Sequence, residues 1–268
     1  MSVARKLIIV GQEAGGVGKS TAVLFLAEMW RESGRSFAIL DADDKNRTTS
    51  GASALSHALP HHVVTWLGTG PTLAEMETDP DRGHAHWDKV RAVLDHHDVL
   101  LDLGANTVQR LLEYAVRMRA AKRWAEDGIT VEVWVPMNAD KINIESGVKA
   151  LTAAGKAFGG AALRAVRNLR DGGFAGWNGS AQGAALDALE KAGVVFVDLP
   201  KAPIPPAGLE AMKRGPWSAF QVCDMGWRDT AQALGLPGPV AERTVYGCED
   251  WIDAVRASFG PVALPGKE

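Results

Sequence analysis

The segment Gly15-Gly16-Val17-Gly18-Lys19-Ser20-Thr21 limits the possible folds of this chain more than any other feature. It follows a short apolar run, Leu7–Val10, which predicts a strand, and it precedes a helical pattern over residues 19–33. Glycines allow the backbone to curl so that successive N–H groups point at one anion, and the start of the helix adds its dipole. A strand, a loop of this kind and a helix are the setting of a phosphate-binding loop. The alternative is a glycine-rich turn with an exposed lysine.

Apolar runs and helical patterns alternate along the rest of the chain. Further strands are predicted at residues 37–41, 99–103, 130–135, 163–166 and 194–199, and further helices at 108–126, 142–158 and 181–192. Strands that alternate with helices of this length predict an α/β fold. We expect a mostly parallel, doubly wound sheet with helices on both faces.

No Ser/Gly-rich linker interrupts the chain, so we predict a single domain over residues 1–268. Residues 55–97 are less regular and contain closely spaced histidines, such as His84 and His86. We interpret this segment as an insertion, or as short helices over one sheet edge, with surface histidines rather than a metal site. From about residue 205 the pattern predicts a helical C-terminal extension.

Composition and charge exclude some classes of protein. The formal net charge of −3 at pH 7 argues against a surface that is basic throughout. No run of about 18 apolar residues appears, so we expect no membrane span and a cytoplasmic protein whose two cysteines stay reduced.

A local basic patch for DNA stays open. Its candidates lie in one predicted helix and one predicted strand region: Arg117, Arg119, Lys122 and Arg123, with Arg164, Arg167 and Arg170. Arginines that alternate in this way more often form a solvated face than a DNA site.

Lysine and serine at the end of the glycine loop suit a nucleotide site. Lys19 would contact the β- and γ-phosphates, and the Ser20 hydroxyl would hold Mg²⁺. The loop therefore predicts ATP or ADP, with Mg²⁺, bound through residues 15–21.

GGVGKST resembles the deviant Walker loop of the ParA/MinD family of nucleotide switches, which usually reads KGGxGK followed by Ser or Thr. Two further segments resemble this family in the same order: ILDADDKNRTTS (residues 39–50) and DVLLDLGAN (residues 98–106). The resemblance implies that Asp43 lies near Mg²⁺ and the attacking water. It also implies that Asp102 supports the metal through water, with Gly104 near the γ-phosphate.

By this resemblance the candidate catalytic residues are Lys19, Asp43 and Asp102, and the candidate metal-binding residues are Ser20, Asp43 and Asp102. The alternatives are a capping or turn role for Asp43 and a solvated strand end for Asp102.

Two other matches concern the nucleotide base. LRAVRNLRD places Asn168 where the family has a strand-end Asn that reads adenine, and VVFVDLPKAP places Pro200 and Lys201 beside the base. A capping or turn role for Asn168 is the alternative. DLGANTVQRLLEYA is also similar to a stretch of TraL-like proteins from conjugative plasmid transfer, which suggests a biological setting but no chemistry.

The chain departs from the family at two loop positions, Glu13 and Ala14. In the family a lysine at the position of Ala14 reaches the partner's nucleotide across a dimer, so its absence implies intact binding and slow hydrolysis. Glu13 replaces a glycine, and we expect its carboxylate to face solvent or a partner's arginine. Arg47 is a candidate source of the missing charge.

Three functions remain open at this point. The first is a nucleotide-dependent switch that forms a homodimer with ATP and engages DNA, a partner protein or both. The second is an ATP-dependent biosynthetic enzyme similar to dethiobiotin synthetase or the cobyrinate amidotransferases, for which no second pocket is recognisable. The third is a nucleotide-binding interaction module without turnover.

Overall fold

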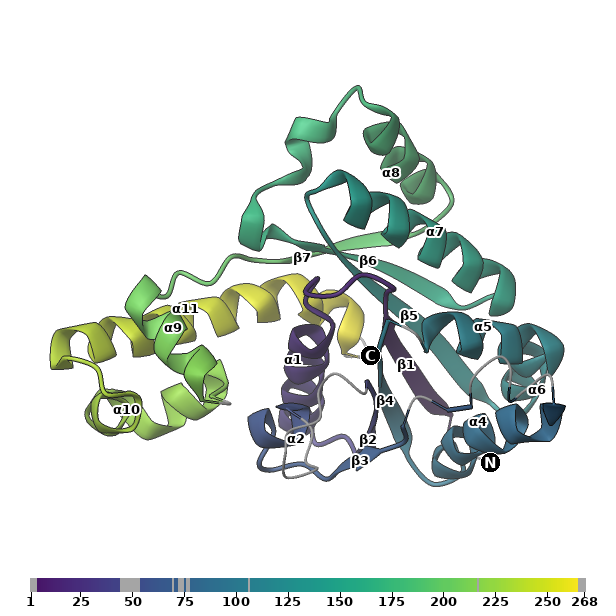
Figure 1. Ribbon diagram of the computed structural model, residues 1–268, viewed down its shortest axis with the longest axis horizontal. Coiled ribbons are helices and arrows are strands. Elements are labelled where there is room, and N and C mark those ends of the chain that lie inside the picture. Colours follow the sequence, from purple (N-terminus) through teal and green to yellow (C-terminus); the bar gives the residue numbers. More distant parts are fainter. Residues whose placement is uncertain are drawn as a thin grey trace.

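The computed structural model describes residues 4–43, 54–68, 70–71, 75, 78–105, 107–215 and 217–264. Within them, parallel strands form one sheet in the order β3-β2-β4-β1-β5-β6-β7 (Figure 1). The strands are β1 (Arg5–Gly11), β2 (Phe37–Ala42), β3 (Val64–Trp66), β4 (Asp98–Leu103), β5 (Ile129–Asn138), β6 (Ala162–Asn168) and β7 (Val195–Leu199). The predicted α/β fold with a parallel, doubly wound sheet is confirmed.

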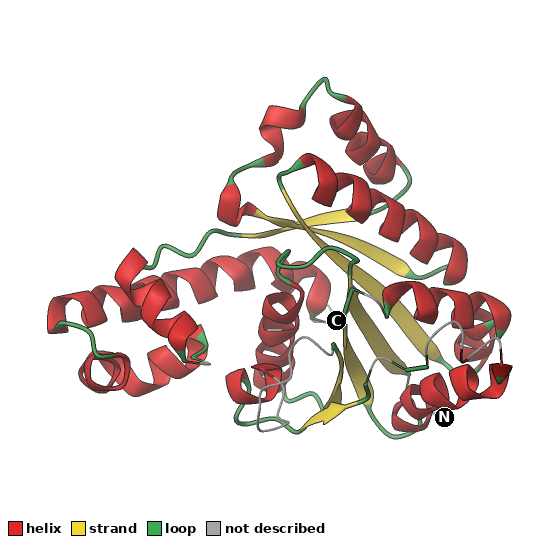
Figure 2. Ribbon diagram, in the orientation of Figure 1, coloured by secondary structure: helices red, strands yellow, loops and turns green. Residues whose placement is uncertain are grey.

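Helices cover both faces of this sheet (Figure 2). They are α1 (Lys19–Glu32), α2 (Ala54–Ala58), α4 (Pro80–Leu94), α5 (Val108–Arg117), α6 (Ala120–Glu126), α7 (Lys141–Ala157), α8 (Ala181–Lys191), α9 (Pro206–Arg214), α10 (Ala219–Leu234) and α11 (Gly238–Ala263). One apolar cluster joins the sheet to α4, α5, α6, α7 and α8, and a second joins it to α1, α2, α9, α10 and α11. Each face therefore has its own core.

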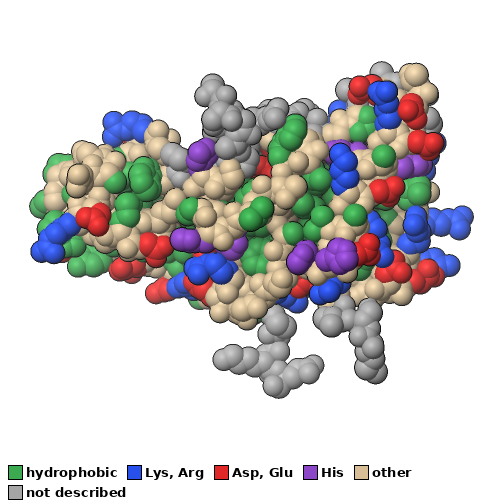
Figure 3. Space-filling model, turned by 90° about the horizontal axis from the view of Figure 1, so that it is seen from below, with side chains coloured by type: hydrophobic (Ala, Val, Ile, Leu, Met, Phe, Trp, Pro, Cys, Tyr) green, Lys and Arg blue, Asp and Glu red, His purple; other side chains and the backbone are tan. Residues whose placement is uncertain are grey.

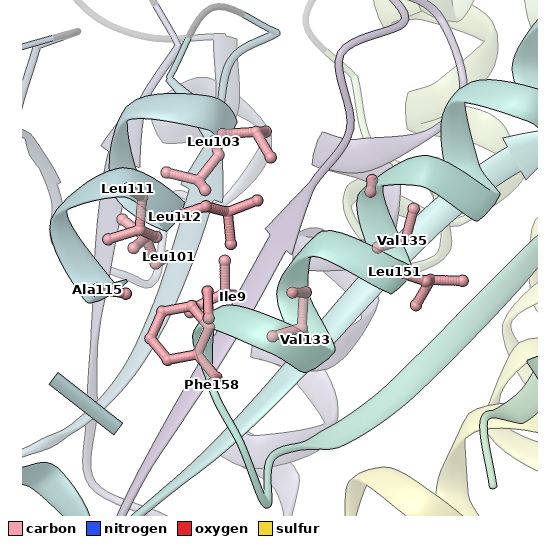
Figure 4. Packing of buried hydrophobic residues seen from close by; sticks show 14 of the residues in the cluster. Ile9, Leu101, Leu103, Leu111, Leu112, Ala115, Val133, Val135, Leu151 and Phe158 are labelled. Carbon is pink, nitrogen blue, oxygen red and sulfur yellow. The ribbon is translucent and has the colours of Figure 1, made fainter. Parts of the chain in front are cut away.

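The first core is close to filled beside β1. Figure 4 shows Leu111, Leu112 and Ala115 of α5 pointing toward Ile9 of β1, with the ring of Phe158 closing the cluster. The cavity lined by Ile9, Leu111, Leu112, Phe158 and their neighbours has a volume of only about 10 Å³. Since apolar burial is the main favourable term in folding, this close packing fixes the position of β1 and of the start of the loop that follows it.

β1 lies at the centre of the sheet, where the order of the strands reverses. It pairs with β4 on one side and with β5 on the other; β2 and β3 lie beyond β4, and β6 and β7 lie beyond β5. In open parallel sheets, ligands bind outside the carboxyl ends of the strands at such a switch point. The loop after β1 is at this position.

The predicted helix over residues 108–126 is wrong in one respect, because it is two helices. α5 ends at Arg117, and Arg119 takes a left-handed conformation (φ 51°) before α6 begins. The break redirects the chain so that Trp124 is buried, with its ring stacked on Phe158 at 5.8 Å between centroids. Burial of a large aromatic side chain thus outweighs the cost of one left-handed residue.

The segment predicted as an insertion contains α2, the short edge strand β3 and the fifteen-residue helix α4. Within it His86 is buried, contrary to the expected surface position. Burial, together with the nearby charges of Lys89 and Arg110, lowers the pKa of His86 to about 4, so the ring is neutral at pH 7.

Helices α9, α10 and α11 form the C-terminal part and extend to one side of the sheet (Figure 1). α11 returns to the body of the protein, where Trp251 packs edge-on against Phe25 of α1, with ring centroids 5.0 Å apart. Among the described residues, none of the helices combines the length and apolar character needed to cross a bilayer.

Candidate functional site

The loop between β1 and α1 is shaped by glycines in left-handed backbone conformations. Gly16 has φ 71° and Gly18 has φ 101°. A side chain at Gly18 would place its Cβ 2.8 Å from Asn168 Nδ2, so this position is restricted to glycine by both conformation and space. Val17 between them is fully buried, which anchors the loop in the core, whereas Gly15 and Gly16 are exposed. The loop is thus anchored in the core by Val17, while its backbone at Gly15 and Gly16 is open to solvent.

Lys19 lies inside this loop. Its side chain folds back so that Nζ donates a hydrogen bond to the carbonyl oxygen of Ala14 at 2.8 Å, and the residue is only 7% exposed. Lys19 is therefore not the exposed lysine of an ordinary turn. Ser20 and Thr21 follow as half-buried residues in the first turn of α1.

Asp102 near the end of β4 is fully buried and accepts a hydrogen bond from Ser20 Oγ at 2.8 Å through its Oδ2 atom. Its Oδ1 atom is buried without a hydrogen-bond partner among the described residues. Burial and, after it, the charge of Asp41 raise the pKa of Asp102 to about 7, although the Ser20 hydrogen bond and Lys19 act in the opposite direction. The negative charge of the Asp102 carboxylate is therefore only partly compensated in the empty protein.

Asp41 and Asp43 complete an acidic group beside Asp102. Asp41 lies opposite Asp102 in the β2–β4 register, is fully buried, and accepts from the backbone N–H of Asp43 at 2.9 Å. Asp43 occupies the space beside Gly104, where a Cβ would lie 2.8 Å from Asp43 Oδ1. Asp43 and Asp102 were selected from the sequence, but Asp41 was not. The position of Asp41 near the end of an apolar predicted strand is the feature of the sequence that could have indicated it.

These oxygen atoms fit a Mg²⁺ ion that arrives with a phosphate ligand. No group of three His, Cys, Asp or Glu side chains in the described part of the chain is arranged to hold a metal alone. Mg²⁺ needs no such cage, because it binds through one or two protein oxygens, waters and substrate phosphates. A cation bound at Ser20 would compensate the negative charge of Asp102, whose Oδ1 atom has no hydrogen-bond partner among the described residues. It would thereby lower the raised pKa of this carboxyl group.

A glycine loop that encloses a buried lysine thus follows the central strand of a parallel sheet, and a buried aspartate on the neighbouring strand accepts from the loop serine. The chain has the fold of a P-loop NTPase.

No family model matches the sequence, and a comparison with curated proteins gives no match either. Among solved structures, the chain is similar to a plasmid partition protein from Borrelia burgdorferi, with 15% identity and a TM-score of 0.41 over 73% of this chain and 89% of that one. It is also similar to the MinC:MinD cell division protein complex from Aquifex aeolicus, with 12% identity and a TM-score of 0.48 over 99% of each chain. A nucleotide-binding protein from Archaeoglobus fulgidus in complex with ADP has 16% identity and a TM-score of 0.41 over 72% of this chain and 81% of that one.

Asn168 joins the end of β6 to the P-loop. It is buried, Nδ2 donates to the carbonyl oxygen of Val17 at 3.0 Å, and Oδ1 accepts from the backbone N–H of Arg170 at 3.0 Å. Both ends of the amide are thus engaged within the protein, as in the alternative turn role, and reading of a base by Asn168 stays a prediction.

Pro200 and Lys201 follow β7 beside Asn168, which pairs with Leu199 in the β6–β7 register. Pro200 is half-buried and its carbonyl oxygen accepts from Trp251 Nε1 at 2.8 Å, while Lys201 is exposed. The structure therefore brings Asn168 and the end of β7 to the P-loop, and leaves the Lys201 side chain at the surface.

Glu13 has a partner that the sequence did not suggest. Its carboxylate lies 3.8 Å from Lys149 Nζ of α7, in the same chain, and both side chains are largely exposed. An exposed pair of this length contributes little to stability. Arg47, the other candidate for added charge, lies outside the described residues.

The basic residues considered for DNA are partly neutralised within the fold. Arg167 pairs with Asp198 at 2.6 Å and Arg170 pairs with Asp171 at 2.8 Å. On the face seen in Figure 3, Lys and Arg side chains are spread out and interleaved with Asp and Glu. Neither observation favours a concentrated basic surface for DNA.

Proposed function

We propose that this protein binds ATP or ADP together with Mg²⁺ and acts as a nucleotide-dependent switch of the ParA/MinD type, with slow ATP hydrolysis. The observation that supports it is the burial of Lys19 inside the glycine loop, next to the Ser20–Asp102 pair at the carboxyl end of the sheet. In the proposed switch, ATP favours a homodimer that engages a partner protein or DNA. The motif resemblance suggests plasmid partition or conjugative transfer as the setting.

The roles of the residues follow from their positions. Backbone N–H groups of the loop and the Lys19 ammonium would hold the phosphates, and Ser20 Oγ would contribute to Mg²⁺ binding. Asp102 accepts a hydrogen bond from the Ser20 hydroxyl and would balance the charge of the ion, and the ion would supply positive charge for the phosphate oxygens. Asp43 lies at the edge of this group, where the gap left by Gly104 admits its carboxylate.

A cytoplasmic location belongs to the same proposal, because ATP and Mg²⁺ are available there. The two cysteines are consistent with it: Cys223 and Cys248 are both free thiols.

Calorimetric titration of the protein with ATP and with ADP, each with and without Mg²⁺, tests the proposal. We expect both nucleotides to bind. Mg²⁺ should strengthen ATP binding, because the ion would compensate the negative charge of the buried Asp102 carboxylate. Adenosine serves as the matched control that lacks phosphates. Equal affinity for adenosine and ADP, or binding of neither nucleotide at millimolar concentration, would rule out the proposed site.

Hydrolysis is expected to be slow because Ala14 offers no cation. The variant Ala14→Lys should increase steady-state ATP turnover about tenfold, which corresponds to roughly 1.4 kcal/mol of activation free energy. Ala14→Met is the control, because it adds a chain of similar length without charge. The rate of the lysine variant should rise with protein concentration if the charge acts across a dimer. Wild-type turnover as fast as that of Ala14→Lys would show that another group already supplies the charge.

A further inference from the structure

Gln12, the first residue after β1, is a polar side chain with no exposed surface. Its Oε1 atom accepts from the backbone N–H of Ala14 at 2.7 Å and from Ser146 Oγ at 3.4 Å. Its Nε2 atom donates to the carbonyl oxygen of Asn143 at 3.2 Å. The side chain therefore bridges the first half of the P-loop and the first turns of α7.

The α7 end of this bridge is itself fixed. Asp140 caps α7, and its Oδ1 accepts from the backbone N–H of Asn143 at 3.0 Å. Asn143 and Ser146 are three residues apart and share one face of the helix. Ile144, between them, is fully buried in the core, so the turn that receives Gln12 is held by packing as well as by its cap.

On the loop side, the bridge continues to Lys19. Gln12 fixes the N–H of Ala14, and the carbonyl oxygen of the same residue receives Lys19 Nζ at 2.8 Å. A continuous series of hydrogen bonds thus runs from α7 through Gln12 and Ala14 to the lysine that would bind phosphate.

We propose that Gln12 is a positioning residue that ties the P-loop to α7 and sets the Ala14 carbonyl where it holds Lys19 before the nucleotide arrives. The proposal rests on the proposed function for its effect on nucleotide affinity, but its structural part concerns the empty protein. Each residue whose backbone is fixed only on binding opposes binding through lost entropy, so a loop ordered in advance binds more tightly. Gln12 orders the loop from within the chain.

The test uses Gln12→Met, which keeps the length of the side chain and removes its hydrogen bonds. Gln12→Glu is the second variant, because it keeps an acceptor for Ala14 and loses the donor to Asn143. Glu13→Gln is the matched control, since it weakens the neighbouring exposed pair with Lys149 and leaves the Gln12 bridge in place. Two quantities are measured for each protein: amide hydrogen exchange without nucleotide, and the dissociation constant for ADP with Mg²⁺.

We expect faster exchange at Ala14 and the following loop amides in both Gln12 variants, with unchanged exchange in β4 and in the second half of α7. ADP affinity should fall about tenfold in Gln12→Met, which corresponds to roughly 1.4 kcal/mol, and should fall at least as far in Gln12→Glu, because its buried carboxylate faces the Asn143 carbonyl oxygen and repels the phosphates. Glu13→Gln should match the wild type in both measurements.

If amide exchange rises equally throughout the protein in both variants, Gln12 stabilises the whole fold and does not position the loop, and the proposal is overturned. Loop exchange that stays at the wild-type rate in a folded variant would overturn it as well. If the wild type binds no ADP, the proposed function fails, and the exchange data still decide whether Gln12 positions the loop.

Discussion

Replacement of Lys19 by alanine is expected to abolish nucleotide binding and leave the empty protein folded. The ammonium group lies within the loop, 2.8 Å from the Ala14 carbonyl oxygen, and the phosphates would take over this donor. Hydrogen bonds to charged groups contribute about 1.5–3 kcal/mol each, and Lys19 would make more than one of them, so we expect a loss of affinity of at least about a hundredfold. Calorimetry with ATP and ADP in the presence of Mg²⁺ measures it.

Lys149→Ala is the matched control for Lys19→Ala. Lys149 is also a lysine next to the loop, but its side chain is exposed and pairs with Glu13. The control should bind ADP with an affinity close to that of the wild type. Unchanged affinity in Lys19→Ala, with a circular dichroism spectrum like that of the wild type, would show that the loop does not bind phosphate. Equal losses in both variants would point to general electrostatic attraction instead.

The features of the site that could be predicted from sequence are those in which local sequence determines the structure. The loop needs residues in left-handed conformations, and glycine supplies them, so GGVGKS predicts the turn between β1 and α1. The position of Asp102 was predicted from the resemblance of DVLLDLGAN to the ParA/MinD family, whereas its complete burial follows from the place of β4 between β1 and β2.

Other features depend on contacts between distant parts of the chain and have no local signal. Gln12 acquires its role from Asn143 and Ser146, which are 131 and 134 residues away. The break at Arg119 is decided by the burial of Trp124 against Phe158, and a helical pattern alone continues through it. The edge strand β3 has three residues, too few for an alternating pattern to emerge.

Replacement of Asp102 by asparagine is expected to stabilise the empty protein at pH 8 and to change how its stability depends on pH. The pKa of Asp102 is about 7 in the folded protein, against an ordinary value of 3.8. Between about pH 4 and pH 7 the folded state therefore holds a proton that the unfolded state has lost. Stability then falls as the pH rises through this window, and the full penalty is present above pH 7.

The size of this penalty follows from the two pKa values. Their difference corresponds to at most ~4 kcal/mol for a group that is fully buried. Asparagine carries no charge and keeps an oxygen that accepts from Ser20 Oγ, so Asp102→Asn removes the penalty without removing the hydrogen bond. Asp250→Asn, at an exposed position on α11, is the control for the loss of one carboxylate.

Urea unfolding at pH 5 and pH 8, with a chelator to remove divalent cations, measures the effect. We expect Asp102→Asn to exceed the wild type in free energy of unfolding by about 2–4 kcal/mol at pH 8, and by clearly less at pH 5. Since the carboxylate is the group that would balance Mg²⁺, the same variant should lose the increase in ATP affinity that Mg²⁺ gives. A gain in stability together with a loss of metal-dependent binding would show that the chain keeps a destabilising charge for its function. A variant that is less stable than the wild type at both pH values would mean that Asp102 is a structural residue and that its charge is already compensated in the empty protein.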